Sequence, residues 1–176
     1  MTDPRKAEDS ARQVRLLALD VDGVLTDGRI VYGNNGEEFK AFNIRDGLGI
    51  KLLQRSGVEV AIITGRQSEI VNRRAAELGI ERVVQGREDK REALQELCDS
   101  LGLTPADCAY MGDDLPDLGA ILVAGLGMTV ADATPAVTAA ADWQASLPGG
   151  AGAVREACEF ILAARDELAG LEAGYR

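Results

Sequence analysis

The sequence predicts an α/β protein built on one doubly wound parallel sheet. Short apolar runs alternate with amphipathic stretches along most of the chain, which is the pattern of repeated βα units. The size agrees, because 176 residues with 46% hydrophobic residues suffice for one compact domain but not for two large ones. We therefore expect a single Rossmann-like domain over 14–170, with a flexible N-terminus over 1–13 and a C-terminal tail over 171–176.

Five apolar runs are the candidate strands of this sheet. They lie at about 15–20, 58–63, 81–84, 108–111 and 126–130. The amphipathic stretches between and after these runs predict helices. These lie at about 47–56, 67–79, 88–101, 114–124 and 152–169. Glycine follows several of the helical stretches, at the position where a left-handed residue commonly ends a helix.

One segment after the first strand breaks the alternation and predicts a β-hairpin over 29–44. Its two strand-like runs flank a turn that contains Asn-Gly, which is a strong hairpin signal. The segment is too short to form a cap domain, so we expect none. Its apolar residues pack either on the domain or on a partner surface, and the marginal stability of an isolated hairpin in water favours a partner. These residues are Ile30, Tyr32, Phe39 and Phe42.

The composition excludes several classes of function. A net charge of −10 without a clustered basic stripe argues against nucleic acid or an anionic membrane as a partner, because both require positive charge. The chain has no histidine, which removes Ser-His-Asp hydrolysis and leaves acid-base chemistry to carboxylates. The three cysteines are widely spaced and are typical of a reduced compartment. With no signal-peptide pattern and no apolar run long enough to span a bilayer, we expect a cytoplasmic protein.

The end of the first strand predicts a site for a hard cation. Asp20 and Asp22 follow an apolar run and adjoin Gly23, and their spacing of two residues directs both side chains to the same place. Carboxylate oxygens of this kind are ligands that Mg²⁺ prefers, with water and substrate phosphate completing its shell. The alternative is an ordinary turn, in which Asp and Gly serve the backbone.

Further polar residues follow the later apolar runs. Thr64 closes the second run, Lys90 opens a helical stretch after the third, and Asp113 closes the fourth. Thr64 has an alternative role as a helix N-cap, and Lys90 as a solvated lysine. Asp114 and Asp117 have an alternative role as negative charges at the start of a helix. The order of these residues relative to the first acid pair favours a common site.

Together these segments resemble the four motifs of the haloacid dehalogenase superfamily of aspartate-based phosphotransferases. More closely, the chain resembles the capless 3-deoxy-D-manno-octulosonate 8-phosphate phosphatase family, over about residues 16–162. The strings that carry the resemblance are DVDGVLTDG (20–28), FNIRDGLGI (42–50), ITGR (63–66), GDDLPDL (112–118) and GGAGAVRE (149–156). The resemblance implies a Mg²⁺-dependent phosphatase that releases the free sugar acid through an aspartyl-phosphate, in lipopolysaccharide precursor synthesis.

The resemblance also implies a role for each acid of the site. Asp20 would be the nucleophile, and Asp22 would act first as general acid and then as base. Asp20, Asp113 and the backbone carbonyl of Asp22 would bind Mg²⁺. Asp114 and Asp117 would be partners that orient these ligands.

The phosphate and the sugar acid require cations and hydrogen-bond donors. Thr64 and Lys90 would be catalytic by holding phosphate oxygens and offsetting negative charge. Arginine suits the sugar-acid carboxylate, because guanidinium pairs with carboxylate in a bidentate fork. The substrate-binding residues that we expect are Thr64, Gly65, Arg66, Arg73, Lys90 and Arg155. Arginine after Ile-Thr-Gly favours the eight-carbon substrate over a nine-carbon sialic-type acid phosphate, whose phosphatases tend to carry an acid there.

The resemblance finally implies a homotetramer formed through the 29–44 hairpin, with C-terminal segments completing neighbouring sites. Two other classes of function stay open at this point. A receiver-type signalling domain also combines acids, Mg²⁺, Thr and Lys, but its acid pair and its phosphorylated Asp lie on different strands. A catalytically silent oligomerisation or regulatory module is the other alternative, and the complete set of expected catalytic residues argues against it.

Overall fold

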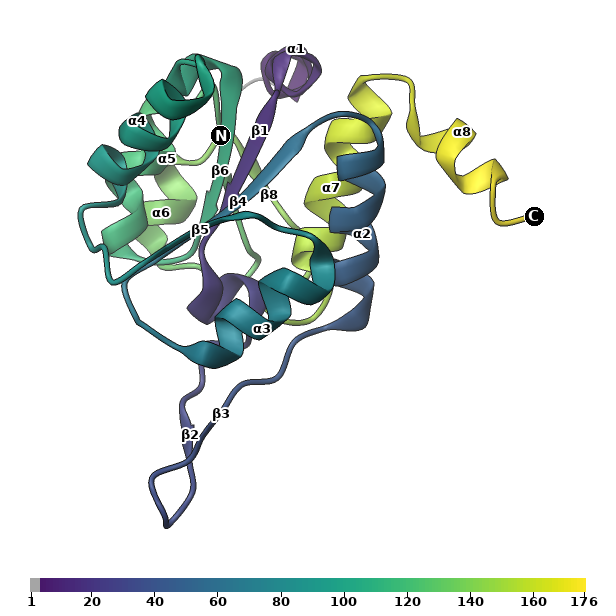
Figure 1. Cartoon of the computed structure of the whole chain (residues 1–176). Coiled ribbons are helices and arrows are strands. Elements are labelled where there is room, and N and C mark those ends of the chain that lie inside the picture. The colour runs from purple at the N-terminus through teal and green to yellow at the C-terminus, as the bar shows by residue number, and fades with distance from the viewer. Residues whose placement is uncertain (1–3) are drawn as a thin grey trace.

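The computed structural model describes residues 4–176 and confirms the predicted α/β fold, with a parallel sheet between two layers of helices (Figure 1). Within these residues the sheet has six strands in the order β5-β4-β1-β6-β7-β8. The strands are β1 (Leu16–Leu19), β4 (Glu59–Thr64), β5 (Arg82–Gln85), β6 (Cys108–Gly112), β7 (Leu126–Thr129) and β8 (Trp143–Gln144). The five predicted strands are present, and β8 is an addition that the sequence pattern did not indicate.

The helices cover both faces of the sheet because the central strands are apolar on both sides. On β1, Leu17 and Leu19 join one core, whereas Leu16 and Ala18 join the other. The first core contains residues of α1 (Pro4–Gln13), α2 (Ile44–Arg55), α3 (Glu69–Leu78) and α7 (Ala153–Ala164). The second contains residues of α4 (Lys90–Leu101), α5 (Leu118–Val123) and α6 (Pro135–Ala140). Three short turns complete the elements, namely η1 (Val21–Leu25), η2 (Pro105–Asp107) and η3 (Leu115–Asp117).

The N-terminal segment corrects the expectation of a flexible stretch over 1–13. Residues 4–13 form helix α1, which packs against α7 and buries Ala7 and Ala11. These alanines lie four residues apart, so they form one apolar face of a helix whose other residues are mostly charged or polar. Residues 1–3 lie outside the described part of the chain.

The hairpin is present but short. Its strands β2 (Val31–Tyr32) and β3 (Glu38–Phe39) pair in antiparallel register and project away from the sheet (Figure 1). Phe42 packs against the core at the base of the hairpin, whereas Tyr32 is 67% and Phe39 is 54% exposed. No cap domain is present in the described residues, as predicted.

The C-terminal helix is divided into two. The predicted helix over 152–169 breaks after α7, where Asp166 has a positive φ of 59°. Helix α8 (Leu168–Ala173) then extends from the body of the protein, with Leu168 and Leu171 partly buried against the first core and no residue fully buried (Figure 1). The expected boundary between domain and tail at residue 170 therefore falls inside α8. Among residues 4–176, no helix combines the length and apolar character needed to cross a bilayer.

Candidate active site

The parallel register brings the predicted site residues to one edge of the sheet. Leu19 of β1 is level with Ile62 of β4 and Met111 of β6, so the residues that follow leave the three strands side by side. Ligands of open α/β sheets bind outside these carboxyl ends, where the strand order reverses. A cleft of about 310 Å³ lies there. It is lined by Asp20, Asp22, Gly28, Thr64, Gly65, Arg66, Glu88, Lys90, Asp113, Asp114, Pro116 and Asp117.

The turn that carries Asp20 and Asp22 lies very close to the end of the neighbouring strand β6. Gly23 has φ of +98°, and a Cβ at this position would lie 2.2 Å from Oδ2 of Asp113. The hydroxyl oxygen of Thr26 accepts hydrogen bonds from the backbone N–H groups of Gly23 at 3.4 Å and Gly28 at 3.2 Å. The turn therefore brings its backbone close to Asp113 on the neighbouring strand end, which argues against the alternative of a generic Asp-Gly turn.

Lys90 is a buried cation rather than a solvated lysine. Its Nζ lies 2.8 Å from Oδ1 of Asp20 and 2.6 Å from Oδ1 of Asp117, and the residue is 4% exposed. Burial disfavours the ammonium, but the charges of the two carboxylates outweigh this effect, so the pKa of Lys90 is raised above its ordinary value.

Thr64 is also buried beside the cleft. The N-cap of α3 is Ser68, so the alternative role of Thr64 as an N-cap is wrong.

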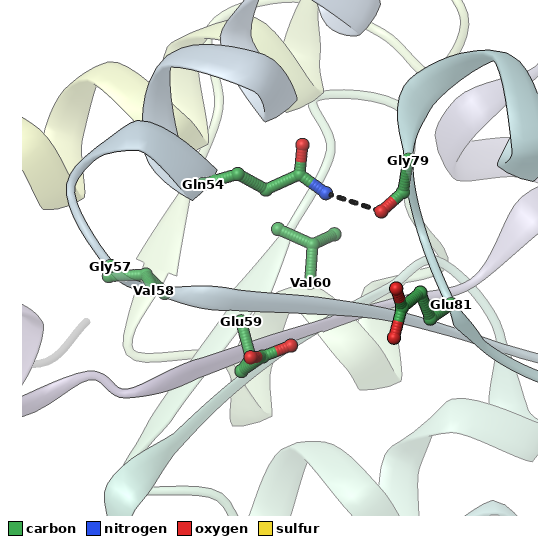
Figure 2. Close-up of a pocket in the computed structure, with 7 residues that line it drawn as sticks. All are labelled: Gln54, Gly57, Val58, Glu59, Val60, Gly79 and Glu81. Atoms are coloured by element: carbon green, nitrogen blue, oxygen red, sulfur yellow. Dashed lines mark hydrogen bonds between the residues drawn. The ribbon is translucent and has the colours of Figure 1, made fainter.

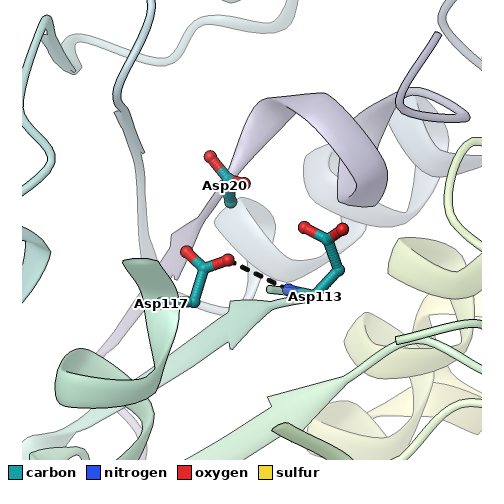
Figure 3. Close-up of side chains that lie close together, drawn as sticks. All are labelled: Asp20, Asp113 and Asp117. Carbon is teal, nitrogen blue, oxygen red and sulfur yellow. Dashed lines mark hydrogen bonds between the residues drawn. The ribbon is translucent and has the colours of Figure 1, made fainter. Parts of the chain in front are cut away.

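Asp117 bonds to groups on both sides of the site. Its Oδ1 accepts hydrogen bonds from Nζ of Lys90 at 2.6 Å and the hydroxyl of Tyr110 at 2.7 Å. Its Oδ2 accepts from the backbone N–H groups of Asp113 at 3.0 Å and Asp114 at 3.2 Å. Figure 3 shows Asp117 and Asp20 beside Asp113, with the bond to the Asp113 backbone. These contacts agree with an orienting role for Asp117.

Tyr110 is a site residue that the sequence analysis missed. It is fully buried within β6, and burial together with the charges of Asp117 and Asp20 raises its pKa well above the ordinary value. The phenol therefore stays protonated and donates to Asp117. A hydroxyl in an otherwise apolar strand was the signal available in the sequence.

Asp114, in contrast, is exposed and caps the turn after β6 by accepting a hydrogen bond from the backbone N–H of Leu115 at 2.8 Å.

The acids fit a divalent cation. Asp20, Asp113 and Asp117 each place a carboxylate oxygen within 4.8 Å of the others. Both oxygens of Asp117 already accept two hydrogen bonds each, which leaves Asp20 and Asp113 as the available carboxylate ligands. Burial, followed by the charge of Asp117, raises the pKa of Asp20 and of Asp113 to about 7. Closely spaced carboxylate oxygens of this kind suit a hard cation such as Mg²⁺, whose charge would offset their mutual repulsion.

Three expected cations differ in where the fold places them. Arg66 lines the cleft, and its NH2 lies 3.2 Å from Oε2 of Glu38 on the hairpin. Arg73 pairs with Glu77 on the exposed surface of α3. Arg155 lies on α7, where its Nε bonds to Glu159 at 2.6 Å. Within one chain, neither Arg73 nor Arg155 lines the cleft.

A second cavity, of about 370 Å³, lies at the opposite end of the strands and does not suit a phosphate (Figure 2). Glu59 and Glu81 line it, and Gln54 crosses it to donate to the carbonyl of Gly79 at 3.3 Å. Its lining contains no lysine or arginine. The cleft at the carboxyl edge is therefore the better candidate for an anionic substrate.

Known proteins resemble this chain in sequence and in fold. The model of the haloacid dehalogenase-like hydrolases matches residues 30–125. The 3-deoxy-D-manno-octulosonate 8-phosphate phosphatase of Escherichia coli K12 is 49% identical over 158 residues, which cover 90% of this chain and 84% of that protein. The chain belongs to this phosphatase family.

Solved structures of this family have the same fold. The Moraxella catarrhalis phosphatase, in complex with magnesium, phosphate and KDO, matches with a TM-score of 0.97 at 45% identity and covers 99% of this chain and 100% of its own. The cobalt-bound phosphatase of Haemophilus influenzae matches with a TM-score of 0.87 at 42% identity, over 90% of this chain and 93% of its own. Family membership excludes the receiver-type alternative.

Proposed function

We propose that this protein is a Mg²⁺-dependent phosphatase that hydrolyses 3-deoxy-D-manno-octulosonate 8-phosphate to the free sugar acid and inorganic phosphate. The observation that carries the proposal is the buried acid cluster, in which Asp20 faces Lys90 and lies beside Asp113 at the carboxyl edge of the sheet. This arrangement combines a nucleophile, a fixed cation and two metal ligands. The substrate is inferred from the relatives of that name, at 49% identity over 90% of the chain.

The geometry supports an in-line displacement in two steps. Asp20 attacks phosphorus and forms an aspartyl-phosphate, while Asp22, at the mouth of the same turn, gives its proton to the departing sugar oxygen. Asp22 then accepts a proton from the water that hydrolyses the aspartyl-phosphate. Lys90 and Thr64 hold phosphate oxygens and offset their charge. Mg²⁺, held by Asp20, Asp113 and the backbone carbonyl of Asp22, would neutralise charge on the transferred phosphoryl group.

Selection of the sugar acid is proposed to rest on cations around this open cleft. Arg66 lines the cleft and is placed to pair with the substrate carboxylate, whereas the backbone N–H groups near Thr64 would hold phosphate oxygens. Arg73 and Arg155 lie outside the cleft of their own chain, so we propose that they act in an assembled oligomer. The alternative substrate is a nine-carbon sialic-type acid 9-phosphate, which Arg66 disfavours.

We further propose a cytoplasmic homotetramer assembled through the 29–44 hairpin. The support is the exposed apolar surface of this hairpin, where Val31, Tyr32 and Phe39 are each more than half exposed. Three such residues close together on a two-stranded hairpin are typical of a contact surface. Assembly would also supply the walls that a cap domain provides in other phosphatases.

The decisive experiment measures phosphate release from three esters with Mg²⁺ or with EDTA. The esters are 3-deoxy-D-manno-octulosonate 8-phosphate, a nine-carbon sialic-type acid phosphate and p-nitrophenyl phosphate. We expect a preference for the first over p-nitrophenyl phosphate, which has no carboxylate, of at least about 100-fold in kcat/KM, because a paired carboxylate can supply that discrimination. We also expect a preference for the first over the nine-carbon ester, which carries the same carboxylate. Asp20→Asn should abolish turnover of all three. Equal, weak activity on all three would overturn the substrate assignment, and a lack of Mg²⁺-dependent release from any of them would favour a silent module.

A further inference from the structure

Lys40 is a buried lysine on an exposed hairpin. Its side chain is 1% exposed, whereas the adjacent Phe39 is 54% exposed. Removing an ammonium group from water costs several kcal/mol unless charged partners and hydrogen bonds compensate for it. The partners of Lys40 must therefore account for its position.

The charged partners of Lys40 connect Arg66, which lines the cleft, with Asp22, which is the expected general acid. The ammonium of Lys40 donates a hydrogen bond to Oδ1 of Asp22. It also lies 3.5 Å from Oε1 of Glu38, whose other oxygen lies 3.2 Å from NH2 of Arg66. Four charges of alternating sign thus follow one another from Arg66 to Asp22. Within residues 4–176, Lys40 is the only residue whose side chain bonds to the Asp22 carboxylate.

This pairing is separate from that of the catalytic lysine. Lys90 contacts Asp20 and Asp117, at 2.8 and 2.6 Å, and makes no ion pair with Asp22. Asp20 is therefore paired with the ammonium of Lys90, and Asp22 is paired with the ammonium of Lys40. One ammonium comes from α4 in the body of the domain, and the other comes from the hairpin.

We propose that Lys40 is the positioning residue for the general acid Asp22; this inference rests on the proposed function. In the first step an oxygen of Asp20 bonds to phosphorus as the ester P–O bond breaks, and the proton of Asp22 passes to the departing alkoxide. Asp22 is left as a carboxylate. The ammonium of Lys40 aims this group at the leaving oxygen and stabilises the charge that develops on it. Because Lys40 belongs to the hairpin, the position of the hairpin sets the position of the acid.

The dependence on leaving group tests this role. Lys40→Met removes the ammonium and keeps most of the length of the side chain. We expect kcat/KM for the sugar acid phosphate to fall about 30-fold, which is less than the roughly 100-fold or more that a general acid supplies, because its alkoxide must be protonated and Asp22 is misplaced rather than removed. The value for p-nitrophenyl phosphate should change less than about 3-fold, because nitrophenolate leaves without a proton. Lys40→Arg should restore part of the loss. The ratio kcat/KM is measured because it reports the steps up to departure of the leaving group, before the aspartyl-phosphate is hydrolysed.

Matched variants separate positioning from a general loss of structure. Lys51→Met, at an exposed position of α2, should leave both esters unchanged. In an Asp22→Asn background, Lys40→Met should cause less than about a 3-fold further loss, because residues that act as a unit are not additive. The proposal is overturned if Lys40→Met loses activity equally on both esters while it melts within a few degrees of the wild type. It is also overturned if Lys40→Met keeps full activity on the sugar ester. If Lys40→Met does not fold, Lys40→Gln provides the same comparison.

The wild-type measurements distinguish this proposal from the proposed function. If the wild type does not prefer the eight-carbon ester, the substrate assignment fails. The Lys40 comparison then uses the sugar acid phosphate that the wild type does hydrolyse, since any alkyl ester requires the proton from Asp22.

Discussion

At the scale of single residues, Asp117 connects the parts of the site. Its carboxylate contacts Lys90 from α4, Tyr110 from β6 and the backbone that follows β6. We expect Asp117→Asn to lower kcat about 10- to 100-fold, because Lys90 and Asp113 lose the group that orients them. It should also reduce the free energy of unfolding by about 1–3 kcal/mol, since the buried ammonium of Lys90 then keeps only Asp20 as a charged partner. Steady-state kinetics and urea denaturation measure the two effects.

Two control variants define how far this effect extends. Tyr110→Phe removes one of the four hydrogen bonds to Asp117, so we expect a loss of about 1 kcal/mol in the free energy of unfolding. Asp114→Asn changes an exposed acid that caps a turn and should leave kcat within about 3-fold, as for most exposed positions. If Asp117→Asn behaved like Asp114→Asn, Asp117 would not be an orienting residue.

The sequence predicted some of these residues and missed others for a physical reason. Asp20, Asp22 and Asp113 are visible because each follows an apolar run that must be a strand. Tyr110 and Lys40 are not visible in this way, because their importance depends on contacts made in the folded protein. An apolar strand accommodates tyrosine without a special role, and a lysine on a hairpin is normally solvated. Their roles follow from burial and partners, which the sequence does not contain.

At the scale of elements, the hairpin is the part of the fold whose purpose lies outside the single chain. Its strands have two residues each, which is too little for independent stability. We expect the double substitution Tyr32→Ser with Phe39→Ser to reduce the mass seen in sedimentation velocity from a tetramer to a smaller species. Leu122→Ser is the matched control, because Leu122 is 65% exposed on α5, outside the hairpin. A wild-type monomer, or an unchanged mass in the double variant, would contradict the proposed assembly.

The elements also show where sequence patterns are informative. The apolar runs predicted β1, β4, β5, β6 and β7 to within one residue at each end, although the run for β5 contains only the apolar pair Val83 and Val84. The two residues of β8 and the six of α6 are too short to show a period. Helix α1 was expected to be flexible because charged residues are frequent in it; within residues 5–13 it is the alanines at positions 7 and 11 that are buried in the core.

At the scale of the whole molecule, the topology assembles a site from residues far apart in sequence. Strand β1 lies at the centre of the sheet, with β4 on one side and β6 on the other. The chain therefore brings Thr64 and Asp113 to opposite sides of Asp20, and helix α4 supplies Lys90 at its first residue. Spacing along the chain indicated a common site, but only the order of the strands explains why these residues meet.

The buried acids of this site also make the stability of the metal-free protein depend on pH. Burial, followed by the charge of Asp117, raises the pKa of Asp20 and of Asp113 to about 7 from the ordinary value of 3.8. Between these two values the folded protein holds protons that the unfolded chain has released. The free energy of unfolding contributed by these groups therefore decreases as pH rises from about 4 to about 7. This penalty, a loss of stability caused by the buried charges, is fully present above the folded pKa of about 7 and is absent below the unfolded pKa of 3.8.

Mg²⁺ should remove this penalty, because it binds the ionised carboxylates and opposes their mutual repulsion. Protons compete with the metal below pH 7, so the apparent affinity for Mg²⁺ should weaken by up to about tenfold per pH unit for each proton displaced. We expect Mg²⁺ to raise the midpoint temperature of unfolding more at pH 8 than at pH 6, measured by calorimetry with excess Mg²⁺ or with EDTA. Asp113→Asn should reduce both the effect of Mg²⁺ and its dependence on pH, whereas Asp99→Asn, at an exposed position of α4 outside the cleft, should preserve them. An equal effect of Mg²⁺ at the two pH values would show that neither Asp20 nor Asp113 exchanges a proton for the metal, and that the cation binds elsewhere.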